Sequence, residues 1–91
     1  MSPASRFRVP DTVIAQTIAG ETVILDLDAG LYFGLDPVGA RIWELVAEGA
    51  TLDAVAAQMV VEYDVARERV ESDIDTLVTA LLEKSLVVED C

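Results

Sequence analysis

The stretch ETVILDLDAGLYFGLDPVGARIWEL, residues 21–45, decides the fold of this chain. Two alternating apolar runs flank an Asp-Ala-Gly turn, and an Asp-Pro pair follows directly. Alternation with a period of two predicts strands, and Asp-Pro is typical of an N-cap followed by the first helical residue. The stretch therefore predicts a β-hairpin whose second strand leads straight into an amphipathic helix.

Working outward, the sequence predicts three antiparallel strands over residues 12–18, 21–28 and 31–35. Gly30 supplies the left-handed position of the hairpin loop. Both connections are short, so the second strand is central and the third is an edge. Successive side chains of the second strand point to opposite faces of the sheet, and we expect one face to be buried. Val23, Leu25 and Leu27 lie on one face, and Ile24, Asp26 and Asp28 lie on the other.

Three helices follow the strands. The first begins after its cap Asp36 and ends at Gly49, the second begins after Thr51 and closes at residues 63–64, and the third runs from about residue 66 to 84. The order predicts an α+β fold. The apolar run 86–88 is a terminal strand or a docked tail.

Length and composition indicate one domain. The first ten residues show no periodicity, so we predict a flexible lead-in over residues 1–8 and the domain over residues 9–88. A hydrophobic content of 53% is too high for a disordered chain. There is no secretory signal and no apolar run of about 18 residues, so we expect a cytoplasmic protein without a membrane span. The net charge of −11 argues against nucleic acid and favours a cationic or neutral peptide or protein partner, unless the acidity only provides solubility.

Side chains for catalysis are scarce. The chain has no histidine, and its single cysteine, Cys91, is the last residue. The acidic pairs at 26 and 28 and at 73 and 75 are better explained as solvated faces than as an acid–base couple. The glycines do not match a phosphate loop. We therefore expect no enzyme activity, no metal and no cofactor.

What remains is recognition. An edge strand offers free N–H and C=O groups to an extended peptide, while neighbouring side chains give specificity. The third strand carries Tyr32 and Phe33, and Gly34 leaves room for close approach. The third helix is the expected wall of such a groove. Its later apolar residues, including Leu77, fit a core role, whereas the part around residues 70–74 fits either role.

These letters resemble the PqqD-like family of RiPP recognition elements, which recognise ribosomally made, post-translationally modified peptides. The resemblance spans roughly residues 9–88 and rests on GETVILDLDAGLYFGLDPVGARIWELVAEGATLDAV, EYDV and DIDTLVTALLEKSLV in this order. The family often has Asn where this chain has Asp36, which caps a helix equally well. It often has Gly where this chain has Ser85, which leaves the end of the third helix less defined.

The resemblance implies a winged-helix-like domain, with a three-stranded sheet followed by a three-helix bundle, that is not an enzyme. It implies that the leader of a precursor peptide adds as a strand to the third strand, over a groove walled by the third helix. The domain then presents the precursor to modifying enzymes. The residues implicated are Leu31, Tyr32, Phe33, Gly34, Leu35, Val70, Asp73, Ile74 and Leu77.

Two client systems fit. The motif YFGLDP with IWE is most similar to the free-standing recognition protein of lasso-peptide clusters, which works with a leader peptidase and a cyclase. The alternative is the recognition protein of pyrroloquinoline quinone (PQQ) biosynthesis or another radical-SAM pathway. From other classes, a winged-helix DNA-binding module shares the element order, and a toxin-neutralising or subunit-interface module would have its apolar strand edge covered by a permanent partner. The negative charge disfavours the former.

Overall fold

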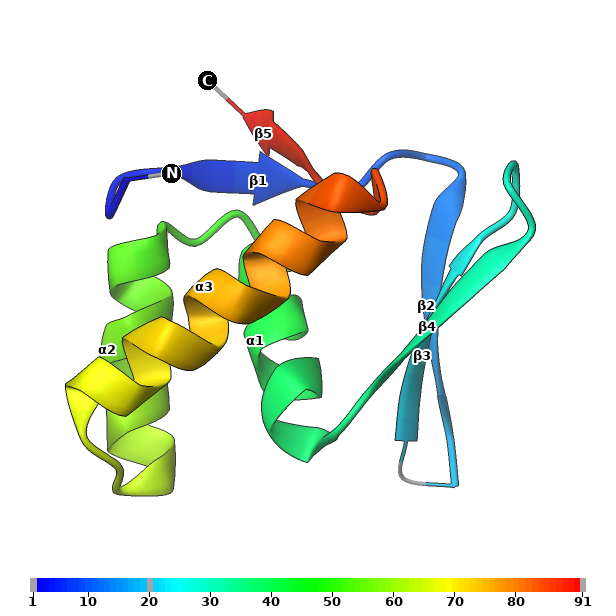
Figure 1. Cartoon of the computed structure of the whole chain (residues 1–91). Helices are drawn as coiled ribbons and strands as arrows, with labels where there is room; N and C mark the ends of the chain where they lie inside the picture. The colour runs from blue at the N-terminus through cyan, green and yellow to red at the C-terminus, as the bar shows by residue number, and fades with distance from the viewer. Residues whose placement is uncertain (1, 20, 91) are drawn as a thin grey trace.

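A computed structural model describes residues 2–19 and 21–90. Cys91, the single cysteine of the sequence, lies outside the described residues. The elements follow the chain in the order β1 (Arg6–Arg8), β2 (Val13–Ile18), β3 (Glu21–Asp26), β4 (Leu31–Leu35), α1 (Pro37–Ala47), α2 (Leu52–Tyr63), α3 (Arg67–Glu83) and β5 (Val88–Asp90). The α+β class is confirmed. In Figure 1 α3 crosses in front of α1, with α2 on one side and the three-stranded sheet on the other.

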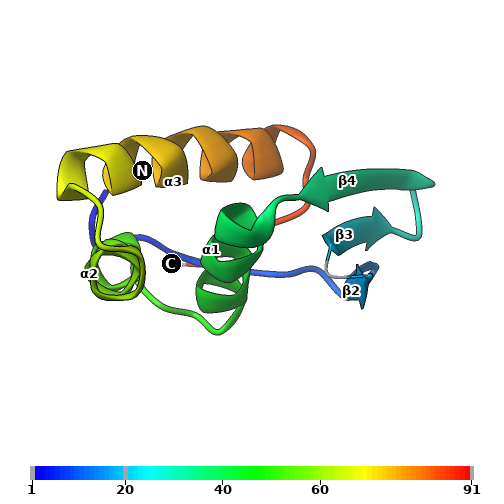
Figure 2. The ribbon, with the colours of Figure 1, turned by 90° about the horizontal axis from the view of Figure 1, so that it is seen from below.

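The main sheet has the antiparallel order β2-β3-β4. Ile24 of the central strand lies between Ala15 of β2 and Phe33 of β4 in the register. The prediction of a central second strand and of β4 as an edge is therefore confirmed. Seen from below, β4 is the strand nearest to α3 (Figure 2).

The buried face of β3 is the one that carries Ile24, which has 0% of its surface exposed, while Val23 and Leu25 are half-buried. The strand ends at Asp26, two residues before the predicted end. The reason is local: one Asp26 carboxylate oxygen accepts hydrogen bonds from the backbone N–H groups of Asp28 and of the next residue, both at 3.1 Å. These bonds turn the chain, as Asx turns do.

The predicted caps position the helices. Asp36 accepts a 2.7 Å hydrogen bond from the backbone N–H of Gly39, and Pro37 follows as the first residue of α1. Thr51 accepts a 3.1 Å bond from the N–H of Ala54 at the start of α2. Each cap satisfies a donor that the first turn of a helix leaves unpaired. The turn after β4 therefore fixes where α1 leaves the sheet.

We expect the substitution Thr51→Ala to lower the free energy of unfolding by about 1 kcal/mol, because an alanine N-cap leaves one donor of the first turn without a protein partner. A urea titration followed by circular dichroism measures this. Thr79→Ala is the matched control, since Thr79 is exposed in the middle of α3. Equal losses in both variants would show that the Thr51 hydroxyl contributes nothing as a cap.

The end of α3 is better defined than the sequence suggests. Ser85 takes a left-handed conformation with φ of 57°, and the N–H of Leu86 donates to the carbonyl of Leu81 at 2.9 Å. This pattern closes the helix as a glycine at the same position does in other proteins, at a cost of roughly 1–2 kcal/mol for a residue with a side chain. The prediction of a less defined helix end is therefore wrong.

The beginning of the chain is the main correction to the prediction. Instead of an irregular, flexible lead-in, Arg6–Arg8 form β1, which pairs antiparallel with β5. Phe7 is 1% exposed and belongs to the core. Three residues are too few to show a period, and their partners in the other strand lie 80 to 84 positions away in the sequence. The final apolar run is buried at Leu86 and Val87 and then continues into β5.

The core lies between the three helices and the inner face of the sheet. Its fully buried members come from every layer and include Ile24, Ile42, Val55, Val78 and Leu81. Burying one such side chain contributes about 1.5–3 kcal/mol. Within residues 2–19 and 21–90, no helix combines the length and apolar character needed to cross a membrane.

Candidate peptide-binding groove

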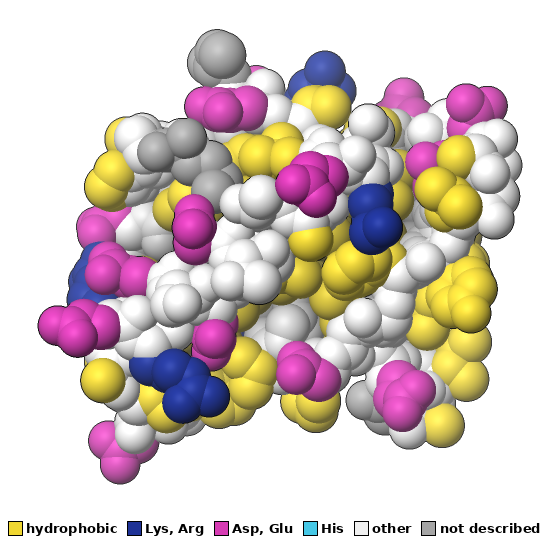
Figure 3. Space-filling model, viewed as in Figure 1, with side chains coloured by type: hydrophobic (Ala, Val, Ile, Leu, Met, Phe, Trp, Pro, Cys, Tyr) yellow, Lys and Arg dark blue, Asp and Glu magenta, His cyan; other side chains and the backbone are white. Residues whose placement is uncertain are grey.

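A groove of about 500 Å³ runs between β4, the start of α1 and α3, and we call it the β4–α3 groove. In Figure 3 hydrophobic side chains gather in the hollow between α3 and the sheet. Most of the lining is apolar or small. The residues that line the groove are Phe33, Gly34, Leu35, Asp36, Val38, Gly39, Ile42, Arg69, Asp73, Thr76, Leu77 and Ala80.

The strand side of the groove comes from the second half of β4. Phe33, Gly34 and Leu35 line it, whereas Leu31 and Tyr32 lie outside it. Tyr32 is 77% exposed, and the register places it beside Leu25 on the outer face of the sheet. A Cβ built on Gly34 meets nothing within 4 Å, so the space beside this residue is open. In the described part of the chain β4 pairs with β3 alone, and its other edge is free.

The helix side of the groove includes two of the four predicted residues of α3, together with residues that were not predicted. Asp73 and Leu77 line it, as predicted, together with residues that the sequence analysis missed, namely Arg69, Thr76 and Ala80. Ile74 is 3% exposed and faces α2 instead. The three missed residues lie three or four positions from Asp73 or Leu77. Helical periodicity anchored on those two residues would therefore have identified them.

Val70 does not line the β4–α3 groove. It is buried at the floor of a neighbouring hollow of about 230 Å³ between α1, the end of α2 and α3. This hollow and the groove share four lining residues, Val38, Ile42, Arg69 and Asp73. Val70 is therefore adjacent to the groove, behind Arg69 and Asp73.

Charges stand at the rim of the groove. Arg69 Nε lies 3.8 Å from an Asp73 carboxylate oxygen, and both side chains are largely exposed. At the other end of α3, the Lys84 ammonium lies 5.9 Å from the centroid of the Phe33 ring, within the range of a cation–π contact. The rim therefore carries the Arg69–Asp73 pair at one end and the Lys84 cation near the other, around an apolar floor.

The wall that α1 contributes is tied to α2 by one guanidinium group. Arg41 donates to both carboxylate oxygens of Glu62 at 2.9 and 3.1 Å, and to Glu44 at 2.9 Å. The hydrogen bonds from Arg41, with a further one from Gln58, hold the pKa of Glu62 below its usual value. This network holds α1 beside α2 on the outside of the molecule.

The acidic side chains that the sequence offered for chemistry have structural surroundings in the described chain. Across residues 2–19 and 21–90, no group of three His, Cys, Asp or Glu side chains is placed to hold a metal ion. Of the acidic pair at 26 and 28, Asp26 serves the hairpin turn. A free strand edge beside an apolar, helix-walled groove is the geometry that strand addition of an extended peptide requires.

The comparisons with known proteins agree with this interpretation of the groove. Residues 21–87 match the family model of coenzyme PQQ synthesis protein D (PqqD). The chain therefore belongs to the PqqD family, and the resemblance found in the sequence is confirmed. A comparison with curated proteins gave no match.

Two solved structures are similar to this chain over most of its length. One is TbiB1 in complex with the TbiA(beta) leader peptide, with 40% identity, a TM-score of 0.80, and coverage of 88% of this chain and 93% of that chain. The other is lasso peptide synthetase B1 complexed with the leader peptide, with 30% identity, a TM-score of 0.83, and coverage of 91% and 98% respectively.

Proposed function

We propose that this protein binds the leader of a ribosomally made precursor peptide, which adds as a strand to the free edge of β4 and places side chains in the β4–α3 groove. The observation that carries the proposal is the coincidence of that free edge with an apolar groove beside the second half of β4. Both similar structures contain a leader peptide, which supports it. In this function the protein is a recognition module and not an enzyme.

The geometry of strand addition assigns roles to the two walls. Main-chain hydrogen bonds to β4 supply affinity that depends little on leader sequence, and side chains on alternate leader positions enter the groove. Phe33 and Leu35 form the floor beside the strand, and Leu77 and Ala80 form the opposite wall. Asp73 and Arg69 meet polar groups of the leader at the rim.

The client is a precursor of a lasso peptide in this proposal, because both similar structures have a leader bound and one is a lasso peptide synthetase B1. The partners are then a leader peptidase and a downstream modifying enzyme, a cyclase. The matching family model favours a second candidate, the handling of a precursor in PQQ biosynthesis or another radical-SAM pathway. Titration with leaders of both types separates the two, since only the cognate leader binds tightly.

Backbone N-methylation of the leader tests strand addition without altering the protein. Each methyl group removes one N–H donor and places bulk at the strand edge, so methylation at alternate leader positions is expected to lower affinity by tenfold or more, and at intervening positions by far less. Fluorescence anisotropy of a labelled leader measures these affinities. Alanine substitution at the same positions is the control for side-chain effects.

A period-two loss supports pairing with β4. Methylation that changes affinity equally at all positions, or nowhere, contradicts strand addition even if the leader binds. Absence of binding by leaders of both types contradicts the proposed function itself.

A further inference from the structure

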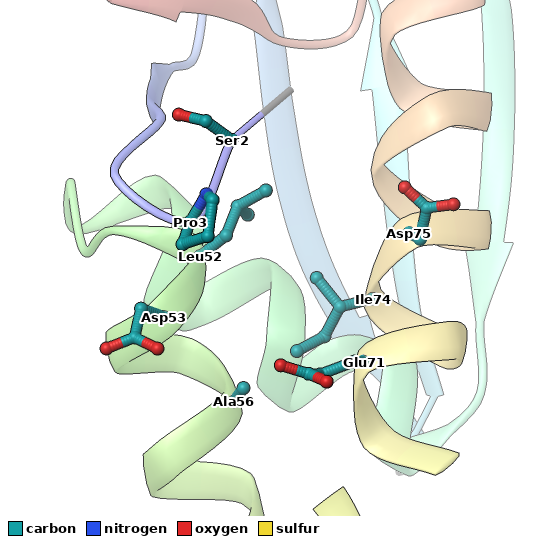
Figure 4. A pocket seen from close by; sticks show the side chains of 8 residues that line it. All are labelled: Ser2, Pro3, Leu52, Asp53, Ala56, Glu71, Ile74 and Asp75. Atoms are coloured by element: carbon teal, nitrogen blue, oxygen red, sulfur yellow. The ribbon is translucent and has the colours of Figure 1, made fainter. Parts of the chain in front are cut away.

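A second recess lies on the other side of α3 from the β4–α3 groove, and we call it the α2–α3 hollow. Its volume is about 180 Å³. The apolar part consists of Pro3, Leu52, Ala56 and Ile74, of which Ala56 and Ile74 are buried. Figure 4 shows Ile74 pointing into the space between the two helices. The hollow is large enough for one apolar side chain of a partner.

The N-terminal segment, which forms the third wall of this hollow beside α2 and α3, is fixed in place by hydrogen bonds. The N–H of Leu52 donates to the carbonyl of Ser5 at 3.1 Å, and the N–H of Asp53 donates to the carbonyl of Pro3 at 2.9 Å. The start of α2 therefore has its free donors satisfied by the N-terminal segment. The N-terminal segment and α2 are thus held together as two sides of one recess.

Carboxylates surround the apolar floor. Asp53 and Glu71 flank it on α2 and α3, and Asp75 stands one turn further along α3 (Figure 4). Arg67 pairs with Asp53 and Glu71, whereas Asp75 takes part in no ion pair among the described residues. These four side chains together carry a charge of about −2, since each ionised carboxylate counts −1 and the guanidinium +1. Each carboxylate also retains acceptor sites for a further donor.

The α2–α3 hollow and the β4–α3 groove use opposite faces of the same helix. At 3.6 residues per turn, Glu71, Ile74 and Asp75 project away from the face that carries the groove residues Asp73, Leu77 and Ala80. The two recesses have no lining residue in common. A leader in the groove therefore leaves the hollow free for another molecule.

We infer that the α2–α3 hollow docks the enzyme that acts on the bound precursor, through an enzyme segment that presents an apolar side chain flanked by Lys or Arg. This inference rests on the proposed function. Charge complementarity indicates the kind of occupant. The hollow is apolar with an acidic rim, so a basic segment is attracted to it and an acidic segment is repelled. A second copy of this chain is disfavoured by its charge of −11.

Asp75→Lys tests the docking surface. Asp75 is exposed and makes no ion pair within the described chain, so reversing its charge leaves the fold intact. The probe is the leader peptidase that processes the same precursor, immobilised and titrated with this protein, with and without leader. We expect Asp75→Lys to weaken peptidase binding roughly tenfold through like-charge contact across the interface. Leader affinity, measured separately by anisotropy, stays within about twofold because the two sites are independent.

Asp11→Lys is the matched control, with the same charge change on an exposed residue outside both recesses. It is expected to bind peptidase and leader as the unaltered protein does. Raising the salt to about 0.5 M should weaken peptidase binding by the unaltered protein and narrow its difference from Asp75→Lys. Equal effects of the two variants, or no effect of either, overturn the docking inference. Failure of the leader to bind the unaltered protein contradicts the proposed function and is read from the anisotropy measurement alone.

Discussion

Leader binding is expected to weaken roughly 30- to 150-fold when Leu77 is replaced by Asp, which corresponds to a loss of about 2–3 kcal/mol. Leu77 is half-buried on the face of α3 that forms the wall of the β4–α3 groove. An apolar leader side chain buried against it would meet a carboxylate that has lost its water and found no partner. Anisotropy titration of a labelled leader measures the change.

Two controls accompany this variant. Thr79→Asp adds the same charge to an exposed position of α3 that lines none of the recesses described here, and it is expected to leave leader affinity unchanged. Leu77→Ala removes the apolar contact without adding charge and is expected to give an intermediate loss. Wild-type affinity in Leu77→Asp, with the protein folded by circular dichroism, would remove α3 from the binding site.

Replacing Ile74 by Asp is expected to unfold the domain or to lower its free energy of unfolding by about 4 kcal/mol or more, out of the roughly 5–15 kcal/mol usual for a domain. Ile74 is almost fully buried between α2 and α3. A carboxylate there would have no cation of its own and would lie near Glu71 and Asp75. Thermal and urea unfolding measure the effect.

Ile74→Val is the conservative control and should cost only about 0.5–1.5 kcal/mol, the usual effect of removing one buried methylene group. The pair of predictions separates two readings of α3. If Ile74→Asp stayed as stable as the unaltered protein and lost only leader affinity, Ile74 would belong to the groove, as the sequence alone suggests.

The elements around the candidate site were predictable because their signals are local. The hairpin, the Asp36 cap, the Pro37 start and the edge position of β4 all follow from residues within a few positions of each other. The phase of α3 was not predictable in the same way. This helix has apolar side chains toward both α2 and the groove, so periodicity alone does not say that Ile74 faces one side and Leu77 the other.

The pairing of β1 with β5 escaped prediction for a different reason. Each strand has three residues, and nothing within either one specifies the other. The pairing depends on the whole domain bringing Phe7 and Val87 into the same core. The α2–α3 hollow could not be predicted for the same reason. Pro3 becomes part of its lining through a hydrogen bond to α2, a segment far from Pro3 in the sequence.

The β1–β5 ladder also governs how the domain can be joined to other proteins. Arg6 lies opposite Asp90 in the register, so the first and last strands of the described chain meet in one ladder. Neither strand supplies a residue to the β4–α3 groove. A partner protein joined to the domain beyond this ladder would consequently leave the free β4 edge accessible.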